Sequence, residues 1–136
     1  AYEMPIFSVD KQQENGIPKL AQDFYEKLGS ADLIVISFAE HNGAYSSAFK
    51  NILDWTSRIS ANTFQGKPML LLATSHGPRG GSTVLEIAKN RFPFQGGIVL
   101  NSFSLPNFNT NFDAEKGILN GALKNELNEI IQTLVF

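Results

Sequence analysis

The sequence predicts one three-layer α/β domain, in which helices cover both faces of a parallel β-sheet. Two observations predict this class: short, nearly continuous apolar runs that end in polar or glycine-rich turns, and helical apolar stripes between these runs. The order helix, strand, helix, strand, helix, strand, helix is typical of right-handed crossovers in a doubly wound sheet. A length of 136 residues, 43% of them hydrophobic, suits a single domain over residues 1–136.

Three segments are predicted to form the strands of this sheet. "DLIVISFA" at residues 32–39 and "PMLLLATS" at residues 68–75 are apolar along most of their length, which is typical of strands buried on both faces. "GIVLNSFSL" at residues 97–105 is a weaker candidate, because Asn101 and Ser102 interrupt its apolar run. Since sheets of this class usually have about five or six strands, the domain is expected to lack its beginning.

Four apolar stripes predict helices between and after these strands. The first stripe, Leu20, Phe24 and Leu28, lies between Pro18, which suits an opening turn, and Gly29, which suits a helix end. The other stripes are Phe49, Ile52, Leu53, Thr56 and Ile59; Val84, Leu85, Ala88 and Phe92; and Leu119, Leu123, Leu127, Ile130, Ile131 and Leu134. The opening segment, residues 1–18, shows neither a strand nor a helix pattern.

Composition restricts the partners and the compartment. With 11 Lys+Arg against 13 Asp+Glu the net charge is -2, and no basic run is present to neutralise phosphates, so no nucleic-acid partner is expected. The chain has no cysteine, which excludes disulfides and thiolate metal sites and suits the cytoplasm. Apolar runs such as residues 69–73 are too short to cross a bilayer. A soluble cytoplasmic protein with no membrane partner is expected.

Two glycine-rich turns follow the first two predicted strands. They are "AEHNGAYSS" at residues 39–47 and "TSHGPRGGST" at residues 74–83. In an open parallel sheet, ligands bind beyond the carboxyl ends of the strands, where backbone groups and helix N-termini are free. Asn42-Gly43 favours positive φ, and the backbone of such turns suits a planar ligand with a polar edge. Neither turn matches a phosphate-binding fingerprint, and ordinary loop chemistry is the alternative interpretation.

The first turn and the helix after it resemble a known family motif. "AEHNGAYSSAFKNILDW" is similar to PEYNGSxPxxLKNxIDW, the signature of the NADPH-dependent FMN reductase family, which includes quinone, chromate and azo-dye reductases. The residues that match in order and spacing are Glu40, Asn42, Gly43, Lys50, Asn51, Asp54 and Trp55. "SHGPRGGST" in the second turn and "GKP" at residues 66–68 also fit, so the resemblance covers nearly the whole chain.

The resemblance implies a flavodoxin-like parallel sheet of five strands, with FMN at the carboxyl ends of the strands, in a homodimer or homotetramer. The cofactor-binding residues that it implies are Glu40, His41, Asn42 and Gly43 in the first turn and Ser75, His76, Gly77, Arg79, Gly80 and Gly81 in the second. The flavin would pass a hydride from NAD(P)H to a small electron acceptor such as a quinone or a flavin. No catalytic residue of the protein and no metal is then required.

The chain departs from the family pattern at both ends of the motif's loop and at its own beginning. Ala39, His41 and Ser46 stand where the family usually has Pro, Tyr and Pro, which predicts a less rigid loop. The family's first strand, its phosphate-binding loop GSxRxxSxN and its second strand have no counterpart, so strand 32–39 would expose an unpaired edge. We expect an N-terminally incomplete reductase. The alternative is a flavodoxin-like module without bound cofactor that acts through protein association.

The helix of the motif carries residues with simple structural interpretations. Trp55 lies at helical spacing from apolar residues and is expected to pack in the core, with a subunit contact as a second role. Lys50 and Asp54, four positions apart, are expected to form an ion pair on a solvated face that Asn51 shares. Further along, Phe108 and Phe112 flank a polar segment and are expected to join the core, to cover a flavin or to form an oligomer contact.

Three other interpretations concern polar residues of the two turns. A metal site is an alternative interpretation of His41, His76 and Glu40, because these residues follow neighbouring strands. Ser75-His76 could belong to a hydrolase, but the absence of a GxSxG elbow from the sequence argues against this interpretation. Arg79, the one cation of the second turn, either meets a cofactor phosphate or the flavin O2, or lies in solvent.

Overall fold

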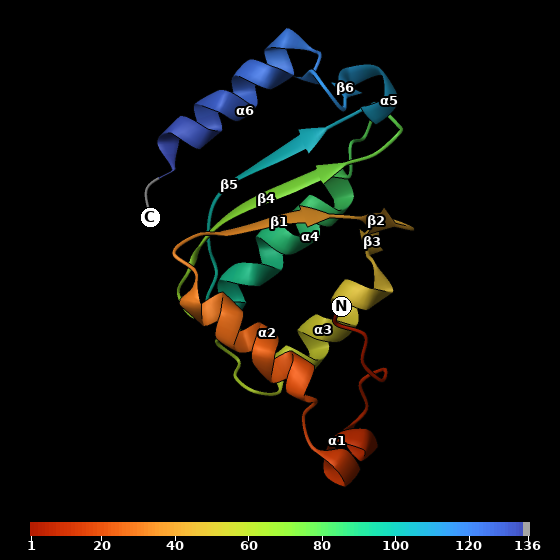
Figure 1. Cartoon of the computed structure of the whole chain (residues 1–136), viewed down its shortest axis with the longest axis vertical. Helices are drawn as coiled ribbons and strands as arrows, with labels where there is room; N and C mark the ends of the chain where they lie inside the picture. Colours follow the sequence, from red (N-terminus) through yellow and green to blue (C-terminus); the bar gives the residue numbers. More distant parts are fainter. Residues whose placement is uncertain (135–136) are drawn as a thin grey trace.

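The computed structural model describes residues 1–134 and has the predicted three-layer α/β architecture (Figure 1). A parallel sheet of three strands has the order β1 (Ile34–Phe38), β4 (Pro68–Thr74), β5 (Ile98–Leu105). The helices are α1 (Val9–Asn15), α2 (Lys19–Ser30), α3 (Ser47–Ser57), α4 (Ser82–Arg91), the 3₁₀ helix η1 (Phe92–Gln95), α5 (Phe108–Asn111) and α6 (Gly121–Thr133). Two short antiparallel ribbons pair β2 (Glu40–His41) with β3 (Ala44–Tyr45), and β6 (Phe112–Asp113) with β7 (Gly117–Ile118).

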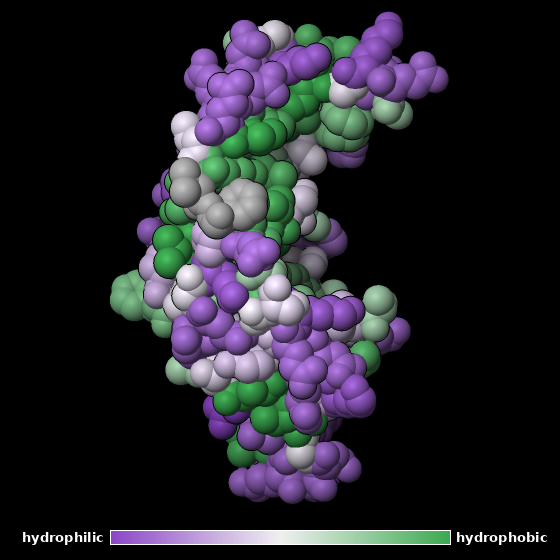
Figure 2. All heavy atoms as spheres, turned by 60° about the vertical axis from the view of Figure 1, so that its left-hand side comes forward, coloured by the Kyte–Doolittle hydropathy of each residue, from purple (hydrophilic) through white to green (hydrophobic). Residues whose placement is uncertain are grey.

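Both sheet faces carry an apolar core. Figure 1 shows α6 on one side of the sheet and α2, α3 and α4 on the other. The larger core includes Phe38, Leu71, Val84 and Phe92, and the smaller core joins β4 and β5 to Ile130 of α6. Figure 2 shows hydrophilic side chains along the outer side of the α6 end and hydrophobic ones beneath them. This is the pattern of a helix that buries only its sheet-facing stripe.

Helix α1 corrects the expectation that residues 1–18 lack a helix. It spans seven residues and buries none of them, so it has no apolar stripe that a sequence pattern could detect. Its ends are nevertheless well specified. The Ser8 side chain accepts a hydrogen bond from the Lys11 N–H, and Gly16 at φ +73° ends the helix.

The remaining helices differ from prediction at their ends. The last helix begins at Gly121 rather than Leu119, because the Asn120 side chain caps it by accepting from the Leu123 N–H at 3.1 Å. Phe92 lies in η1 and not in α4, since Pro93 follows it and cannot continue the helical hydrogen bonds. The polar segment after β5, predicted as a loop, contains α5 and the β6–β7 ribbon.

The two best predicted strands differ in how they are buried. β4 is central and largely buried, as predicted for a strand covered on both faces. Strand β1 is not, because among residues 1–134 it pairs with β4 alone and Val35 is 52% exposed. Its free edge faces an apolar groove of about 730 Å³, which α2, α3 and the first residues of the chain also line. The expected unpaired edge is therefore present in the described structure.

Tyr45 of β3 lies in an aromatic cluster on the larger core. Its ring stacks on Phe92 at 17° with centroids 6.3 Å apart, and contacts Phe49 and Phe38 at 5.1 and 5.7 Å. The hydroxyl oxygen is shielded from solvent and has no hydrogen-bond partner among the described residues. Burial raises the pKa of Tyr45 to about 12, although the nearby Arg91 guanidinium opposes the shift.

The raised pKa of Tyr45 predicts a loss of stability in alkali. Below about pH 10 the phenol is protonated in the folded and the unfolded chain, so its titration does not affect stability. As the pH rises from about 10 towards 12, the unfolded chain loses this proton while the folded chain keeps it, so the free energy of unfolding falls. In urea titrations over this range, Tyr45→Phe should show a shallower fall. Parallel profiles for wild type and variant would contradict this.

Candidate functional site

A cavity of about 500 Å³ lies at the carboxyl ends of β1 and β4, where the sequence predicted ligand binding. The turn after β1, the turn after β4 and the first residue of α5 enclose it. Its lining residues are Ser37, Phe38, Ala39, Glu40, His41, Thr74, Ser75, His76 and Phe108. Polar side chains thus meet an aromatic wall at Phe108, a composition typical of sites for small organic ligands.

The first turn is the β2–β3 hairpin. Asn42 at φ +52° and Gly43 at φ +74° form its tip, which confirms the positive φ predicted for Asn-Gly. These two residues do not line the cavity, whereas Glu40 and His41 do. The Ser46 side chain, where the family has a second Pro, caps α3 by accepting from the Phe49 N–H at 3.2 Å. The hairpin is thus fixed by its own ladder and by the helix cap that follows it.

The carboxylate of Glu40 caps a helix in the other turn. Its Oε2 accepts a hydrogen bond from the Val84 N–H at 2.9 Å, in the first turn of α4. Gly81, at the N-cap position of α4, has no side chain to satisfy that donor. A carboxylate at a helix N-terminus also interacts favourably with the helix dipole. Glu40 therefore joins the first turn to α4, the helix that follows the second turn.

Removal of this cap should destabilise the protein modestly. Glu40→Ala is expected to lower the free energy of unfolding by about 1 kcal/mol, because the Val84 N–H loses its acceptor. Glu40→Gln keeps a side-chain oxygen of similar reach and should cost less. Urea unfolding of the three proteins measures both effects, and equal losses in the two variants would contradict the capping role.

The second turn presents backbone as well as side chains. Ser75 and His76 line the cavity. Within residues 1–134, the backbone N–H groups of His76 and Gly77 donate to no protein acceptor, and of these two residues His76 lines the cavity. Arg79 is exposed and donates to the Thr83 hydroxyl at 2.5 Å, outside the cavity lining. Its guanidinium stays on the α4 side of the turn in this structure.

Gly80 and Gly81 are buried and position the turn. Both have positive φ, of +56° and +74°. A Cβ on Gly81 would lie 2.7 Å from the Ala73 Cβ, and a Cβ on Gly80 would overlap the Ser104 hydroxyl, which donates to the Gly80 carbonyl at 2.8 Å. Neither residue lines the cavity. They allow the turn to pack directly against β4 and β5.

The loop after β5 forms the third wall, which the motif comparison did not predict. Asn107 N–H donates to the Gly77 carbonyl and Phe108 N–H donates to the Ser75 carbonyl, both at 2.9 Å. Thr74 Oγ1 donates to the Leu105 carbonyl at 2.6 Å on the same side. These hydrogen bonds, between residues about thirty positions apart, bring Phe108 to the cavity. Sequence spacing contains no signal for them.

The polar residues of α3 bind the first residues of the chain. Asn51 Oδ1 accepts from the Phe7 N–H at 2.9 Å, and its amide nitrogen donates to the Met4 and Pro5 carbonyls. Trp55 is buried, as predicted, and its Nε1 donates to the Pro5 carbonyl at 2.7 Å. The solvated role expected for Asn51 is therefore wrong, because a side chain with a donor and an acceptor matches an extended backbone segment.

The neighbouring pair Lys50 and Asp54 forms the predicted ion pair. The Lys50 ammonium donates to the Asp54 carboxylate at 2.7 Å, four positions along α3. Both side chains are at least 36% exposed, so the pair contributes about 0.5 kcal/mol or less. These two matches to the family motif thus lie on the helix surface and away from the cavity lining.

Neither alternative chemistry for the turns finds support in the geometry. Ser75 Oγ donates to the Gly77 carbonyl at 3.2 Å instead of to a histidine, so it is not arranged as an activated nucleophile. His41 and His76 line the same cavity, with Glu40 beside them. Yet no group of three or more metal-binding side chains gathers anywhere in residues 1–134.

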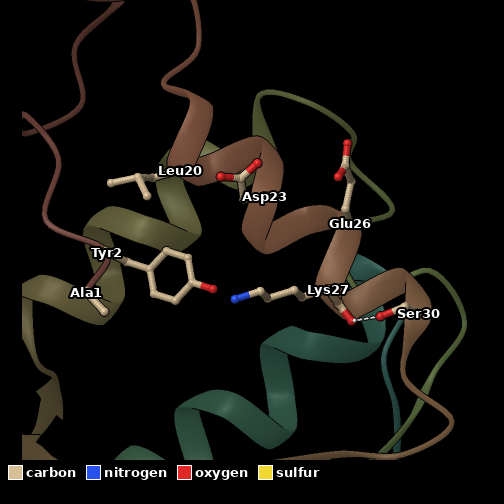
Figure 3. A pocket seen from close by; sticks show the side chains of 7 residues that line it. All are labelled: Ala1, Tyr2, Leu20, Asp23, Glu26, Lys27 and Ser30. Atoms are coloured by element: carbon tan, nitrogen blue, oxygen red, sulfur yellow. Dashed lines mark hydrogen bonds between the residues drawn. The ribbon is translucent and has the colours of Figure 1, made fainter.

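A second cavity of about 520 Å³ lies between α2 and the first residues of the chain (Figure 3). Figure 3 shows the Tyr2 hydroxyl pointing towards the Lys27 ammonium, and that hydroxyl raises the Lys27 pKa. Asp23 also lines this cavity, and its carboxylate is bonded to Lys19. In this second cavity Lys19 pairs with Asp23 and Tyr2 lies beside Lys27, whereas the strand-end cavity is lined by both predicted turns. We therefore treat the strand-end cavity as the candidate site.

The described helices include none with the length and apolar character that a membrane span requires.

Comparisons with known proteins identify relatives of the chain. A quinone reductase of Escherichia coli (strain K12) is 30% identical over 110 residues, which cover 73% of this chain and 58% of the relative. A 2-hydroxy-1,4-benzoquinone reductase of Burkholderia sp is 32% identical over 78 residues, 57% of this chain and 42% of the relative. The chain thus spans about half of the length of these two curated relatives.

A solved structure has the same fold. FerB, a flavoenzyme NAD(P)H:(acceptor) oxidoreductase from Paracoccus denitrificans, superposes with a TM-score of 0.71 over 96% of this chain and 74% of that chain, at 19% sequence identity. The predicted flavodoxin-like fold is confirmed by this likeness. The family model described as "NADPH-dependent FMN reductase" matches residues 1–110, a range that includes both strand-end turns and Phe108. The chain therefore belongs to the NADPH-dependent FMN reductase family.

Proposed function

We propose that the protein is an NAD(P)H-dependent oxidoreductase that binds FMN in the strand-end cavity and reduces a small electron acceptor, such as a quinone or a flavin. The observation that carries this proposal is the cavity itself. It lies at the carboxyl ends of two adjacent parallel strands and combines polar residues of both turns, among them His76 with its unpaired N–H, with an aromatic wall at Phe108. Family membership and quinone-reducing relatives support the same chemistry.

The residues around the cavity fit the ring of FMN. The unpaired His76 N–H suits the polar edge of a flavin, and Phe108 provides apolar contact for one of its faces. His41 and Ser75 are proposed to contact the same ring. When bound, the flavin would supply the hydride chemistry, and the protein would orient the ring and exclude water.

The other predicted residues have supporting places in this proposal. Asn42 and Gly43 shape the hairpin beside the ring, and Gly80 and Gly81 allow the second turn to pack close to the sheet. Glu40 holds the two turns together through α4. Arg79, the cation nearest to the cavity's second turn, is proposed to meet a phosphate of NAD(P)H. A cytoplasmic homodimer or homotetramer is proposed by analogy with the family.

An absorbance spectrum of the purified protein, between about 350 and 500 nm, tests this function directly. The protein should show flavin bands, or acquire them when FMN is added, and anaerobic NADPH or NADH should bleach them. Reoxidation by benzoquinone would then establish the acceptor class. A protein that binds FMN without reduction by either nucleotide would contradict the reductase activity.

A flavodoxin-like module that acts through protein association is the second candidate. The apolar groove along the free edge of β1 favours it, because such an edge can accept another strand. The same spectrum separates the two candidates. A colourless protein that does not bind added FMN would favour the module over the enzyme.

A further inference from the structure

Phe108 is an aromatic residue from outside the two turns that nevertheless lines the cavity. It is the first residue of α5, which follows β5. In Figure 1, the segment with α5 and β6 lies beyond the carboxyl ends of β4 and β5, next to the turn that follows β4. The cavity therefore has an aromatic wall contributed by a separate segment of the chain.

The backbone of Phe108 is fixed to the second turn. Its N–H donates to the Ser75 carbonyl at 2.9 Å, and Asn107, at φ +49°, donates to the Gly77 carbonyl at the same distance. The Asn111 side chain closes the short helix by donating to the Pro106 carbonyl at 2.8 Å. The position of Phe108 relative to the free N–H groups of the second turn is thus determined by hydrogen bonds.

The ring of Phe108 is held from two directions. Phe112 stacks on it at 18° with centroids 4.9 Å apart, and the His76 ring meets it edge-on at 6.5 Å and 81°. Phe112 belongs to β6, whose pairing with β7 fixes it in turn. An aromatic ring that is already immobilised loses little conformational entropy when a ligand stacks against it.

We infer that Phe108 is a specificity-determining residue that selects planar conjugated rings in the strand-end cavity. This inference rests on the proposed function and adds which residue determines the ligands that the cavity prefers. A planar ring gains stacking energy from a preorganised aromatic wall, whereas an inorganic or non-planar electron acceptor gains none. Both the flavin ring and a quinone are planar conjugated rings.

Riboflavin is the first probe, because it carries the flavin ring without the phosphate. Titration of riboflavin fluorescence gives its Kd for the wild type, Phe108→Leu and Phe108→Trp. If Phe108 stacks on the flavin, Phe108→Leu should weaken riboflavin binding about two- to tenfold, and Phe108→Trp should bind riboflavin as the wild type does. Phe94→Leu is the matched control, because Phe94 is 80% exposed and does not line the cavity.

Steady-state kinetics with bound FMN shows whether Phe108 stacks on the flavin ring or on the electron acceptor. Here the KM for benzoquinone, which is planar, is compared with that for ferricyanide, which is not. If Phe108 stacks on the acceptor, Phe108→Leu should raise the KM for benzoquinone about two- to tenfold, with riboflavin affinity and the KM for ferricyanide unchanged. If it stacks on the flavin, riboflavin affinity should fall instead.

A third measurement covers the case in which Phe108→Leu does not fold. The wild type has one tryptophan, so Phe108→Trp adds a second indole, whose emission riboflavin should quench beyond the wild-type effect. Wild-type riboflavin affinity and benzoquinone KM in a folded Phe108→Leu variant, or the absence of added quenching in Phe108→Trp, would overturn this inference alone. A wild-type protein that binds no flavin would overturn the proposed function together with it.

Discussion

Replacement of Trp55 by alanine is expected to lower the free energy of unfolding by about 3–5 kcal/mol, because it removes a large buried side chain. The indole is 1% exposed, and the Phe7 ring packs edge-on against it at 5.0 Å. Its Nε1–H bond to the Pro5 carbonyl would be lost as well. Urea unfolding followed by circular dichroism measures the effect.

A conservative variant separates packing from hydrogen bonding at Trp55. Trp55→Phe keeps an aromatic ring and loses the bond to Pro5, so it should cost about 1 kcal/mol for the bond and a further amount for the smaller ring. The Phe7 N–H donates a hydrogen bond to the Asn51 side chain. Its hydrogen exchange should accelerate more in Trp55→Ala than in Trp55→Phe. A loss below about 1 kcal/mol in Trp55→Ala would show that the first residues of the chain do not pack on α3.

Gly81→Ala is expected to destabilise the protein by about 2–4 kcal/mol and to weaken flavin binding. The new Cβ would lie 2.7 Å from the Ala73 Cβ, and an alanine at φ +74° is strained by about 1–2 kcal/mol in addition. Relief of this contact requires the second turn to move away from β4. Thermal unfolding and a riboflavin titration measure the two effects.

The matched control lies in the same turn. Gly77 has no atom within 4 Å of an added Cβ and does not have positive φ, so Gly77→Ala should change the stability by less than about 0.5 kcal/mol. Equal destabilisation by Gly77→Ala and Gly81→Ala would contradict the close-packing role of Gly81. The difference between the two variants therefore measures the contact with the sheet together with the strain of positive φ, and not the general loss of a glycine.

The fold was largely readable from the sequence, because apolar periodicity reports which residues face the core. Residues 68–75 were predicted as a strand and β4 occupies Pro68–Thr74, since a continuous run such as Leu70–Leu72 is stable only where both faces are covered. Helix α1 escaped prediction for the opposite reason: it buries no residue, and only its caps specify it. The exposure of Val35 depends on what pairs with β1, which no local pattern encodes.

The candidate site was only partly readable from the sequence. The strand-end position of both turns and the positive φ of Asn42 and Gly43 follow from local chemistry. The bond from the Val84 N–H to Glu40 spans 44 positions, and the contact of Phe108 with the second turn depends on the path of the loop after β5. Such contacts arise from tertiary structure, so the family resemblance assigned Glu40 to the cofactor site without indicating its helix cap.

The hydrogen bond between Glu40 and α4 also has a thermodynamic consequence. Because this bond joins the first turn to the helix that follows the second turn, we expect a displacement of either one to affect the other. The free energies of Glu40→Ala and Gly81→Ala should then be non-additive in a double-mutant cycle, since displacement of α4 already breaks the bond that Glu40→Ala removes. A ligand that orders one turn would then order the other at no further entropic cost. The affinity of the cavity for its ligand would therefore depend more steeply on the stability of the two turns than it would if each turn acted alone.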